Sequence, residues 1–363
     1  MEQPHSALPI AAAVAAVYSA AALLFAHWSF STTAVACALP LVLLASALAA
    51  RAIRGDPATL KGIEVGLTER GLFHQAGDLI GGDRLNRPRF LLVAMPINHF
   101  GERVRWALDL IGAPYEEYTV GGLISAFLRG RSVPQLIDRK TCSLIGNSDE
   151  CLAYLSAAYV PSITDARLRS KAISFLRNDE QTAAWDVKLN QLGHLVQGWA
   201  YFYVLDPDTT PEGCLTAWGG YEPMVPLTHR VILRLGHPFF RFFMRMAFEL
   251  SSPDVRDRRR KMIDAILDEA DSALSKQKYL TGDELSHVDI TFSALVAPLL
   301  AGRLVLAPQS SYAKGRFSSF NGAMKRMSDR WPQALAEFEL NLLKRPCAKH
   351  VISLYEVLRS KQL

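Results

Sequence analysis

The polar residues best placed for chemistry stand where predicted helices begin. Asn98 and Ser148 each precede or open a helical pattern, and Ser286 and Asp289 form an S-x-x-D motif in front of an apolar helix. Asn and Ser are preferred at helix N-caps, where a side-chain oxygen accepts a backbone amide, and S-x-x-D is a capping-box pattern. Free amides and the helix dipole at such starts also favour a bound anion. The sequence therefore predicts capped helix starts, some of which could hold an acidic ligand.

Other chemical motifs are missing from the sequence. It contains no Walker loop, G-x-G-x-x-G turn, HExxH pair or nucleophile elbow. Its cysteines are odd in number, far apart and without metal-ligand spacing, which predicts reduced thiols and no metal site. They are Cys37, Cys142, Cys151, Cys214 and Cys347. The formal net charge of +5 suits an anionic membrane surface or an acidic ligand. No groove-reading or base-stacking motif accompanies it, so no nucleic acid is expected as a partner.

A small α/β unit is predicted in the middle of the chain. Its elements are a strand at 89–97, a helix at 101–112, strands at 115–120 and 133–137, and a helix from Ser148. In the first helix the apolar residues share one face and the charged residues are expected elsewhere. Pro134 removes an amide donor from its strand, so it requires an edge, a bulge or a special bend. A cis Val133–Pro134 peptide is one such bend.

This unit resembles a known family. The stretch MPINHFGERVRWALDLIGAPYEEYTV resembles the opening of glutathione transferases, particularly the omega-like and tau-like classes, in which a short turn leads into an F-x-x-R-x-R helix. SVPQLI resembles their cis-proline strand, and GNSDECLAYL resembles the start of their next helix. The resemblance covers residues 89–159 and implies an α/β thioredoxin-like domain followed by an all-α glutathione-transferase C-terminal domain.

The resemblance also implies a glutathione site. The backbone of Val133, before Pro134, would pair with the cysteinyl part of glutathione as an added strand would. The γ-glutamyl carboxylate would lie at the next helix start, with the Ser148 hydroxyl donating to it. Asn147 stands where the family often has an acidic residue, and it could still hydrogen-bond the ligand. The alternative for Ser148 is that it only caps its helix.

Catalysis in the resembled family needs a group beside the first helix that acts on the glutathione sulfur, and this position corresponds to Asn98. An Asn amide can donate to a thiolate but cannot form a mixed disulfide. Asn98 is therefore compatible with conjugation or peroxide reduction, whereas Cys-type thiol exchange at this position is excluded. The alternative is that Asn98 is a structural cap. His99 has no evident partner acid, so we expect an exposed turn residue rather than a base.

From about residue 166 the patterns are helical. Residues 262–274 predict a core-facing helix, and the RDRRRK run from Arg256 predicts a solvated helix start near anionic lipid. Ser286 and Asp289 resemble the buried capping box of the family's helical domain, which implies a structural role. An aromatic segment recurs at helical spacing with arginines on another face, and it could form core, the wall of a co-substrate pocket or a helix on a membrane surface. Its residues are Phe239, Phe242, Phe243 and Met246, with Arg241 and Arg245.

The N-terminal residues predict a membrane anchor. Leu8–Ala26 and Phe30–Ala50 contain no charged residue, and each run is about long enough to cross a bilayer core of about 30 Å. The two runs therefore predict two transmembrane helices. Basic residues follow the second run, so the positive-inside rule predicts that the folded body faces the cytosol. A cleaved targeting segment or a single span are the alternatives.

The sequence thus predicts a membrane anchor at 1–54, a linker at 55–88, a thioredoxin-like glutathione-binding domain at 89–160 and an all-helical domain at 166–363. The expected function is glutathione conjugation or glutathione-dependent peroxide reduction, with glutathione as co-substrate and a hydrophobic small molecule as its partner. A homodimer is the usual assembly of the resembled family. The alternative is a non-catalytic scaffold or hydrophobic-ligand carrier. A channel-like redox protein is disfavoured because position 98 is not Cys.

Overall fold

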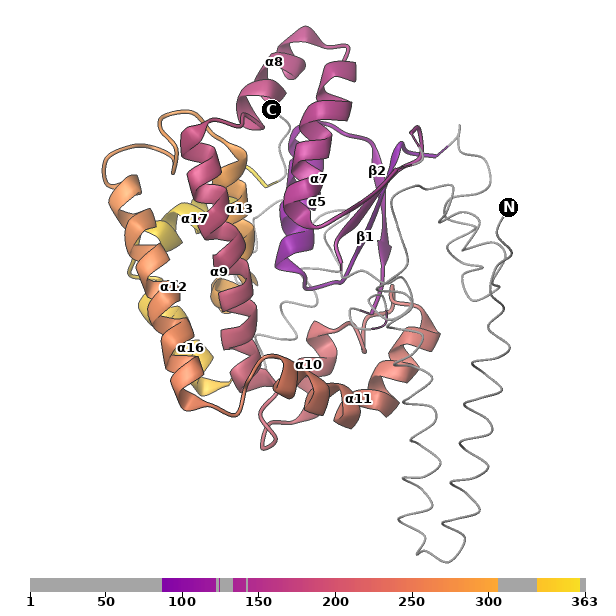
Figure 1. Cartoon of the computed structure of the whole chain (residues 1–363), viewed down its shortest axis with the longest axis vertical. Coiled ribbons are helices and arrows are strands. Elements are labelled where there is room, and N and C mark those ends of the chain that lie inside the picture. Colours follow the sequence, from indigo (N-terminus) through magenta and orange to yellow (C-terminus); the bar gives the residue numbers. More distant parts are fainter. Residues whose placement is uncertain (1–86, 122–123, 125–132, 142, 306–331, 360–363) are drawn as a thin grey trace, which may run out of the picture. The chain divides into compact units, whose positions relative to one another are not determined.

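The computed structural model describes residues 87–121, 124, 133–141, 143–305 and 332–359 (Figure 1). The two uncharged N-terminal runs, and the predicted linker up to residue 86, lie outside these residues. Within the described ranges, no helix has both the length and the apolarity that a bilayer crossing requires.

Four strands form one mixed sheet in the order β2-β1-β3-β4. They are β1 (Phe90–Ala94), β2 (Tyr115–Thr119), β3 (Gln135–Asp138) and β4 (Ser143–Gly146). β1 pairs parallel with β2 across a helical connection, α5 (His99–Leu110), whereas β1–β3 and β3–β4 are antiparallel. All residues of β1 are buried, as expected of a central strand covered on both faces. This order, with a cis Val133–Pro134 peptide before β3, is the thioredoxin-like arrangement that the sequence predicted.

The sequence prediction missed one strand and placed several strand ends differently. β4 was not predicted because its SLIG segment is short and mostly half-buried, and its strand structure comes from pairing with β3. β3 begins at Gln135 rather than Val133, since Pro134 has no amide to donate. β1 ends at Ala94, before Pro96 and the turn that leads into α5.

Helix α5 is buried almost all round, including the charged residues that the sequence analysis placed away from its apolar face. Glu102, Arg103 and Arg105 are each at most 1% exposed. Their charges are paired inside the protein, because Glu102 contacts Arg105 and Arg105 also contacts Glu117 on β2. Burial of charge is tolerated when it is paired and hydrogen-bonded. The charged side of α5 is therefore part of an internal interface.

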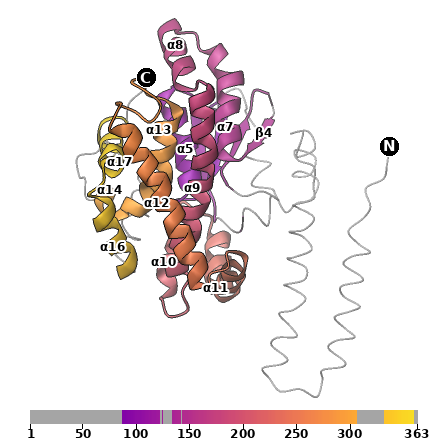
Figure 2. The ribbon, with the colours of Figure 1, turned by 60° about the vertical axis from the view of Figure 1, so that its left-hand side comes forward.

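The rest of the described chain is helical. The helices are α7 (Ser148–Tyr154), which continues as a π turn (Leu155–Tyr159) and a 3-10 turn (Val160–Ser162), α8 (Ala166–Phe175), α9 (Glu180–Val204), α10 (Pro211–Ala217), α11 (Leu227–Ala247), α12 (Pro253–Leu274), α13 (His287–Val296), a 3-10 turn (Ala297–Leu300), α14 (Ala301–Val305), α16 (Gln333–Leu342) and α17 (Pro346–Val357). All residues of α13 are buried. Helices α9, α12, α13 and α17 pack together, with α13 also against α5 (Figures 1 and 2).

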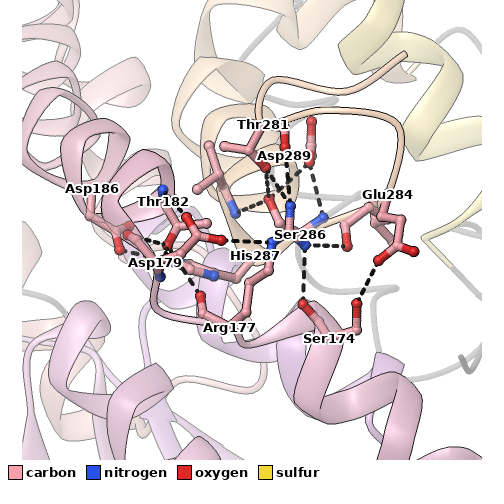
Figure 3. Close-up of polar contacts among 12 residues, drawn as sticks. Ser174, Arg177, Asp179, Thr182, Asp186, Thr281, Glu284, Ser286, His287 and Asp289 are labelled. Atoms are coloured by element: carbon pink, nitrogen blue, oxygen red, sulfur yellow. Dashed lines mark hydrogen bonds and ion pairs between the residues drawn. The ribbon is translucent and has the colours of Figure 1, made fainter. Parts of the chain in front are cut away.

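The predicted S-x-x-D motif caps the buried helix α13 (Figure 3). Ser286 Oγ accepts from the amide of Val288, and Asp289 Oδ2 accepts from the amide of Ser286 at 3.1 Å. Asp289 Oδ1 also accepts from the amide of Leu280 at 2.8 Å. A side chain that is 0% exposed thus satisfies amides on two segments.

A second capping box lies beside the first one and starts α9. Asp179 accepts from the amide of Thr182, whose hydroxyl accepts from the amide of Asp179. Arg177 joins the two boxes, since its guanidinium donates to the hydroxyl of Thr281 at 2.9 Å and that hydroxyl lies 2.9 Å from Ser286 Oγ (Figure 3). The two helix starts are therefore one hydrogen-bonded unit.

The C-terminal end of α17 is tied to α5 by buried charge. Arg359, which is 0% exposed, donates to Glu102 Oε1 at 2.6 Å and to Asp109 Oδ2 at 2.8 Å. Burial by itself would raise the pKa of Glu102, but the guanidinium groups of Arg359 and Arg105 outweigh it and hold that pKa below its ordinary value. The charged form of Glu102 is therefore a structural part of the interface between the sheet domain and the helical layer.

Candidate functional site

Three chain segments meet at one end of the sheet. In the β3–β4 pair, Gln135 lies opposite Gly146, so Pro134 and Asn147 come next on the two chains. β1 runs alongside β3 and pairs Val93 with Gln135, so the turn into α5 also begins at this end. The cis-proline turn and the start of α7 are thus neighbours, as the predicted ligand cradle requires.

Asn98 joins two of these segments. It is the N-cap of α5, where its Oδ1 accepts from the amide of Gly101 at 3.0 Å. Its Nδ2 donates to the carbonyl of Val133 at 3.1 Å, and the residue is 5% exposed. The amide nitrogen has two hydrogens, so one remains for a further acceptor. Asn98 therefore caps α5, as the alternative interpretation predicted. One hydrogen of its Nδ2 is not used in these contacts.

The peptide between Val133 and Pro134 is cis, and Val133 is half-buried. Because the Val133 carbonyl already accepts from Asn98, pairing with a ligand backbone would use the Val133 amide and the second lone pair of the carbonyl. The Asn98 contact fixes the direction of this peptide plane.

The start of α7 is not capped by a side chain. Its N-cap residue is Asn147, which has φ 61° and ψ 144° and makes no side-chain cap hydrogen bond. Positive φ is uncommon for a residue other than Gly and tends to occur at functional sites. Asn147 instead donates to Glu150 Oε1 at 3.2 Å. The first amides of α7 therefore lack the side-chain acceptor that α5 has in Asn98.

Ser148 is the first residue of α7 rather than its cap, so the reading in which it only caps the helix is wrong. The side chain is buried, at 4% exposed, and its Oγ accepts from Arg103 Nη1 at 3.5 Å. An Oγ that accepts from a guanidinium keeps its own hydrogen for donation. The hydroxyl hydrogen of Ser148 is therefore available for donation.

Arg103 is a site residue that the sequence analysis did not single out. It is 1% exposed, and its Nη2 pairs with Asp186 Oδ1 on α9 at 3.2 Å. Its buried Nε has no hydrogen-bond partner among the described residues. Burial lowers the pKa of Arg103, although a guanidinium stays charged at neutral pH. The signal for it was the first arginine of the F-x-x-R-x-R pattern.

Asp186 extends this contact to the helical layer. Its other oxygen, Oδ2, lies 2.9 Å from Nε2 of His287, the residue that follows the capping serine of α13 (Figure 3). A polar chain therefore runs from Ser148 through Arg103 and Asp186 to His287. The predicted capping box, which is more than a hundred residues from the cradle in sequence, is linked to it in space.

His99 is buried, which corrects the expectation of an exposed turn residue. It is 8% exposed and its Nε2 lies 3.1 Å from the carbonyl of Gly193 on α9, so Nε2 carries the hydrogen. Burial lowers the pKa of His99 from its ordinary 6.5 to about 4. The ring is neutral at pH 7 and joins α5 to α9.

This buried histidine predicts a loss of stability in mild acid. The unfolded chain takes up a proton at His99 below pH 6.5, whereas the folded protein does so only near pH 4, so stability falls as the pH drops between these values. The full shift corresponds to about 3 kcal/mol. His99→Gln, which can still donate to the Gly193 carbonyl, should show a smaller loss between pH 7 and pH 5 in urea unfolding. Equal losses in the variant and the original protein would show that His99 is not the group responsible.

Neither protein-family models nor curated proteins match this chain. Solved structures similar to it include Ure2p5 from Phanerochaete chrysosporium, cocrystallised with 1-(S-glutathionyl)-2,4-dinitrobenzene, at 16% identity over 74% of this chain and 94% of that one, TM-score 0.33. Another is a glutathione transferase family member from Pseudomonas fluorescens Pf-5 with two glutathione bound, at 13% identity over 73% and 92%, TM-score 0.35. A third is the β-etherase LigF from Sphingobium sp. strain SYK-6, at 14% identity over 73% and 99%, TM-score 0.37. At these values the likeness establishes no family, and the contacts of this chain carry the functional argument.

Proposed function

We propose that this protein binds glutathione at the cradle formed by Val133, Pro134, Asn147 and Ser148, and uses it as co-substrate for conjugation or peroxide reduction. The observation that carries the proposal is the meeting of the cis-proline turn with an uncapped helix start above a buried arginine. Two of the solved structures described above hold the same class of ligand, glutathione or a glutathione conjugate.

The start of α7 suits the γ-glutamyl carboxylate. Amides without a side-chain cap and the positive end of the helix dipole both favour an anion there. Ser148 would add a hydroxyl donor, and the charge of Arg103 lies behind it. Asn147, which is exposed, would take part through its amide, without the negative charge that the resembled family often has.

The sulfur would lie near Asn98, whose remaining Nδ2 hydrogen can donate to a thiolate. A hydrogen bond to the charged form lowers the pKa of a thiol and so increases its reactive fraction. Phe100 lies partly exposed beside this position, with its ring centroid 5.3 Å from that of His194 on α9. This pair would form the side of the site that meets a hydrophobic electrophile.

The membrane attachment belongs to the same proposal. The uncharged runs Leu8–Ala26 and Phe30–Ala50 would hold the folded body at a membrane on its cytosolic side. Electrophiles or peroxides that partition into lipid would then be concentrated near the site. Assembly as a homodimer stays a prediction.

Calorimetric titration of the full chain in detergent micelles with glutathione tests the proposal. We expect saturable binding, weakened about tenfold or more by Ser148→Ala, since a hydrogen bond to a charged group contributes about 1.5–3 kcal/mol. Ser174→Ala is the matched control, because Ser174 Oγ is exposed and donates to Glu284. Absence of glutathione binding in the unaltered protein would overturn the proposal.

One observation favours the alternative, a non-catalytic carrier of the same fold. Both ends of the Asn98 amide are engaged in structural hydrogen bonds, which leaves a single donor for sulfur chemistry. Turnover assays of the unaltered protein with a chlorodinitrobenzene and with an organic hydroperoxide separate the two. Glutathione binding without turnover would favour the carrier, and turnover of either substrate would favour the enzyme.

A further inference from the structure

Most of the exposed large apolar side chains in the described part of the chain lie on α11. Leu235, Phe242 and Met246 are 80%, 67% and 61% exposed. The full set on this helix is Leu227, Val231, Ile232, Leu235, Phe239, Phe242, Phe243 and Met246. Residues three and four apart lie on the same side of a helix, so this set forms one continuous stripe along α11. We call these residues the α11 stripe.

A different set of α11 side chains attaches the helix to the protein. The buried residues are His229, Leu233, His237, Phe240 and Met244. Of the three alternatives for Phe239, Phe242, Phe243 and Met246, packing in the core is therefore the one that the structure contradicts. The helix is apolar on two faces, and periodicity alone does not tell which of them meets the body. Only one face is buried, and the other is left in contact with solvent.

Four arginines lie along one flank of the stripe, between the exposed and the buried faces. They are Arg230, Arg234, Arg241 and Arg245, and α11 itself contains no Asp or Glu. Three of them donate to backbone carbonyls, Arg234 to Gly220, Arg241 to Pro207 and Arg245 to Leu205. Within the described ranges none of the four forms an ion pair with a carboxylate. Contact with a neutral carbonyl leaves the positive charge available.

We propose that α11 lies in the surface of an anionic lipid bilayer, with the α11 stripe inserted among the acyl chains and the arginines at the headgroup phosphates. A helix with an apolar face, aromatic side chains and flanking basic residues fits an interfacial position. Arginine side chains can bury their apolar stems while their charged ends reach the phosphates. Each basic residue near an anionic surface contributes about 1 kcal/mol.

A bilayer fits this surface better than other occupants do. The helix has 21 residues, so the stripe is about 30 Å long, and its charge is of one sign only. A second copy of the same surface would bring like charges together. The inference is independent of glutathione binding. A negative result for lipid insertion would not affect the proposal of glutathione binding, and a negative result for glutathione binding would not affect the proposal of lipid insertion.

Lipid quenching of a fluorophore tests the insertion. A thiol-reactive nitrobenzoxadiazole would be attached to Leu235→Cys in the full chain, with Cys37 and Cys142 replaced by Ala, because Cys151, Cys214 and Cys347 are buried. The protein would be reconstituted into phosphatidylcholine vesicles with and without phosphatidylglycerol, each containing doxyl-labelled lipid. The control position is Val187→Cys, which is 73% exposed on α9 and not part of the stripe.

We expect quenching at position 235 and little at 187, with the quenching at 235 at least about twofold stronger when phosphatidylglycerol is present. Arg241→Gln with Arg245→Gln should reduce that difference, because Gln can still donate to the carbonyls without the charge. No quenching at 235, or equal quenching in both lipid compositions, would overturn the proposal. So would protection of the label at 235 from aqueous iodide without quenching by doxyl-labelled lipid, which would indicate that a segment of this chain or a second copy covers the stripe.

Discussion

Replacing Asp289 with Ala should lower the free energy of unfolding by about 3–5 kcal/mol, which is among the largest effects that a single change can have in this protein. The carboxylate is 0% exposed and accepts from the amides of Leu280 and Ser286 and from the hydroxyl of Ser286. Each buried donor left without an acceptor costs about 1–3 kcal/mol. Guanidinium unfolding followed by tryptophan fluorescence measures the loss.

Two other variants sharpen this result. Ser286→Ala removes the cap but leaves Asp289 bonded to the backbone, so a smaller loss of about 1 kcal/mol is expected. Asp257→Ala removes an exposed carboxylate that pairs with Arg256 on the surface, and it should leave the unfolding midpoint unchanged. A loss for Asp289→Ala no larger than that for Ser286→Ala would contradict the role of Asp289 in joining two segments.

Replacing Glu102 with Ala should destabilise the protein by about 3 kcal/mol. Glu102 accepts from Arg359 at 2.6 Å and from Arg105 at 2.7 Å, and all three side chains are buried. Its removal takes one negative charge away from two buried guanidinium groups. Arg105 still pairs with Glu117, and Arg359 still pairs with Asp109. Because those pairs remain, the expected loss of stability is at the lower end of the range that follows from breaking a buried ion pair.

Glu102→Gln separates charge from shape, because it retains hydrogen-bond acceptance on one side only. We expect Glu102→Gln to lower the free energy of unfolding by less than Glu102→Ala does. We also expect increased proteolysis or hydrogen exchange at the end of α17, because Arg359 would be held less firmly. Glu337→Gln on α16 is the matched control, as Glu337 is exposed and contacts Gln333. Unchanged protection of α17 in Glu102→Gln would show that Arg359 is held by its other contacts.

Local patterns in the sequence predicted most of the elements near the site. The strands at β1 and β2, the helix after Asn98, the cis bend before β3 and the capping box of α13 each depend on residues within a few positions of one another. Side-chain period, proline geometry and capping act over this range. A contact with the sulfur of a ligand does not follow from such local patterns, so a role of Asn98 in catalysis stays a prediction.

Long-range contacts decided what the local patterns left open. Whether Glu102 and Arg103 face solvent depended on Arg359, which is 257 residues from Glu102, and on Asp186, which is 83 residues from Arg103. The contact of Ser148 depended on Arg103, which is 45 residues away and donates to its Oγ. The buried state of His99 depended on Gly193 on α9.

The sequence by itself determined the type and approximate position of most elements near the site, because capping, side-chain period and proline geometry act between neighbouring residues. The tertiary structure alone decided which of two apolar faces of α11 is buried, and which charges of α5 are paired. Those outcomes depend on the partner that each face meets, and that partner comes from a distant part of the chain.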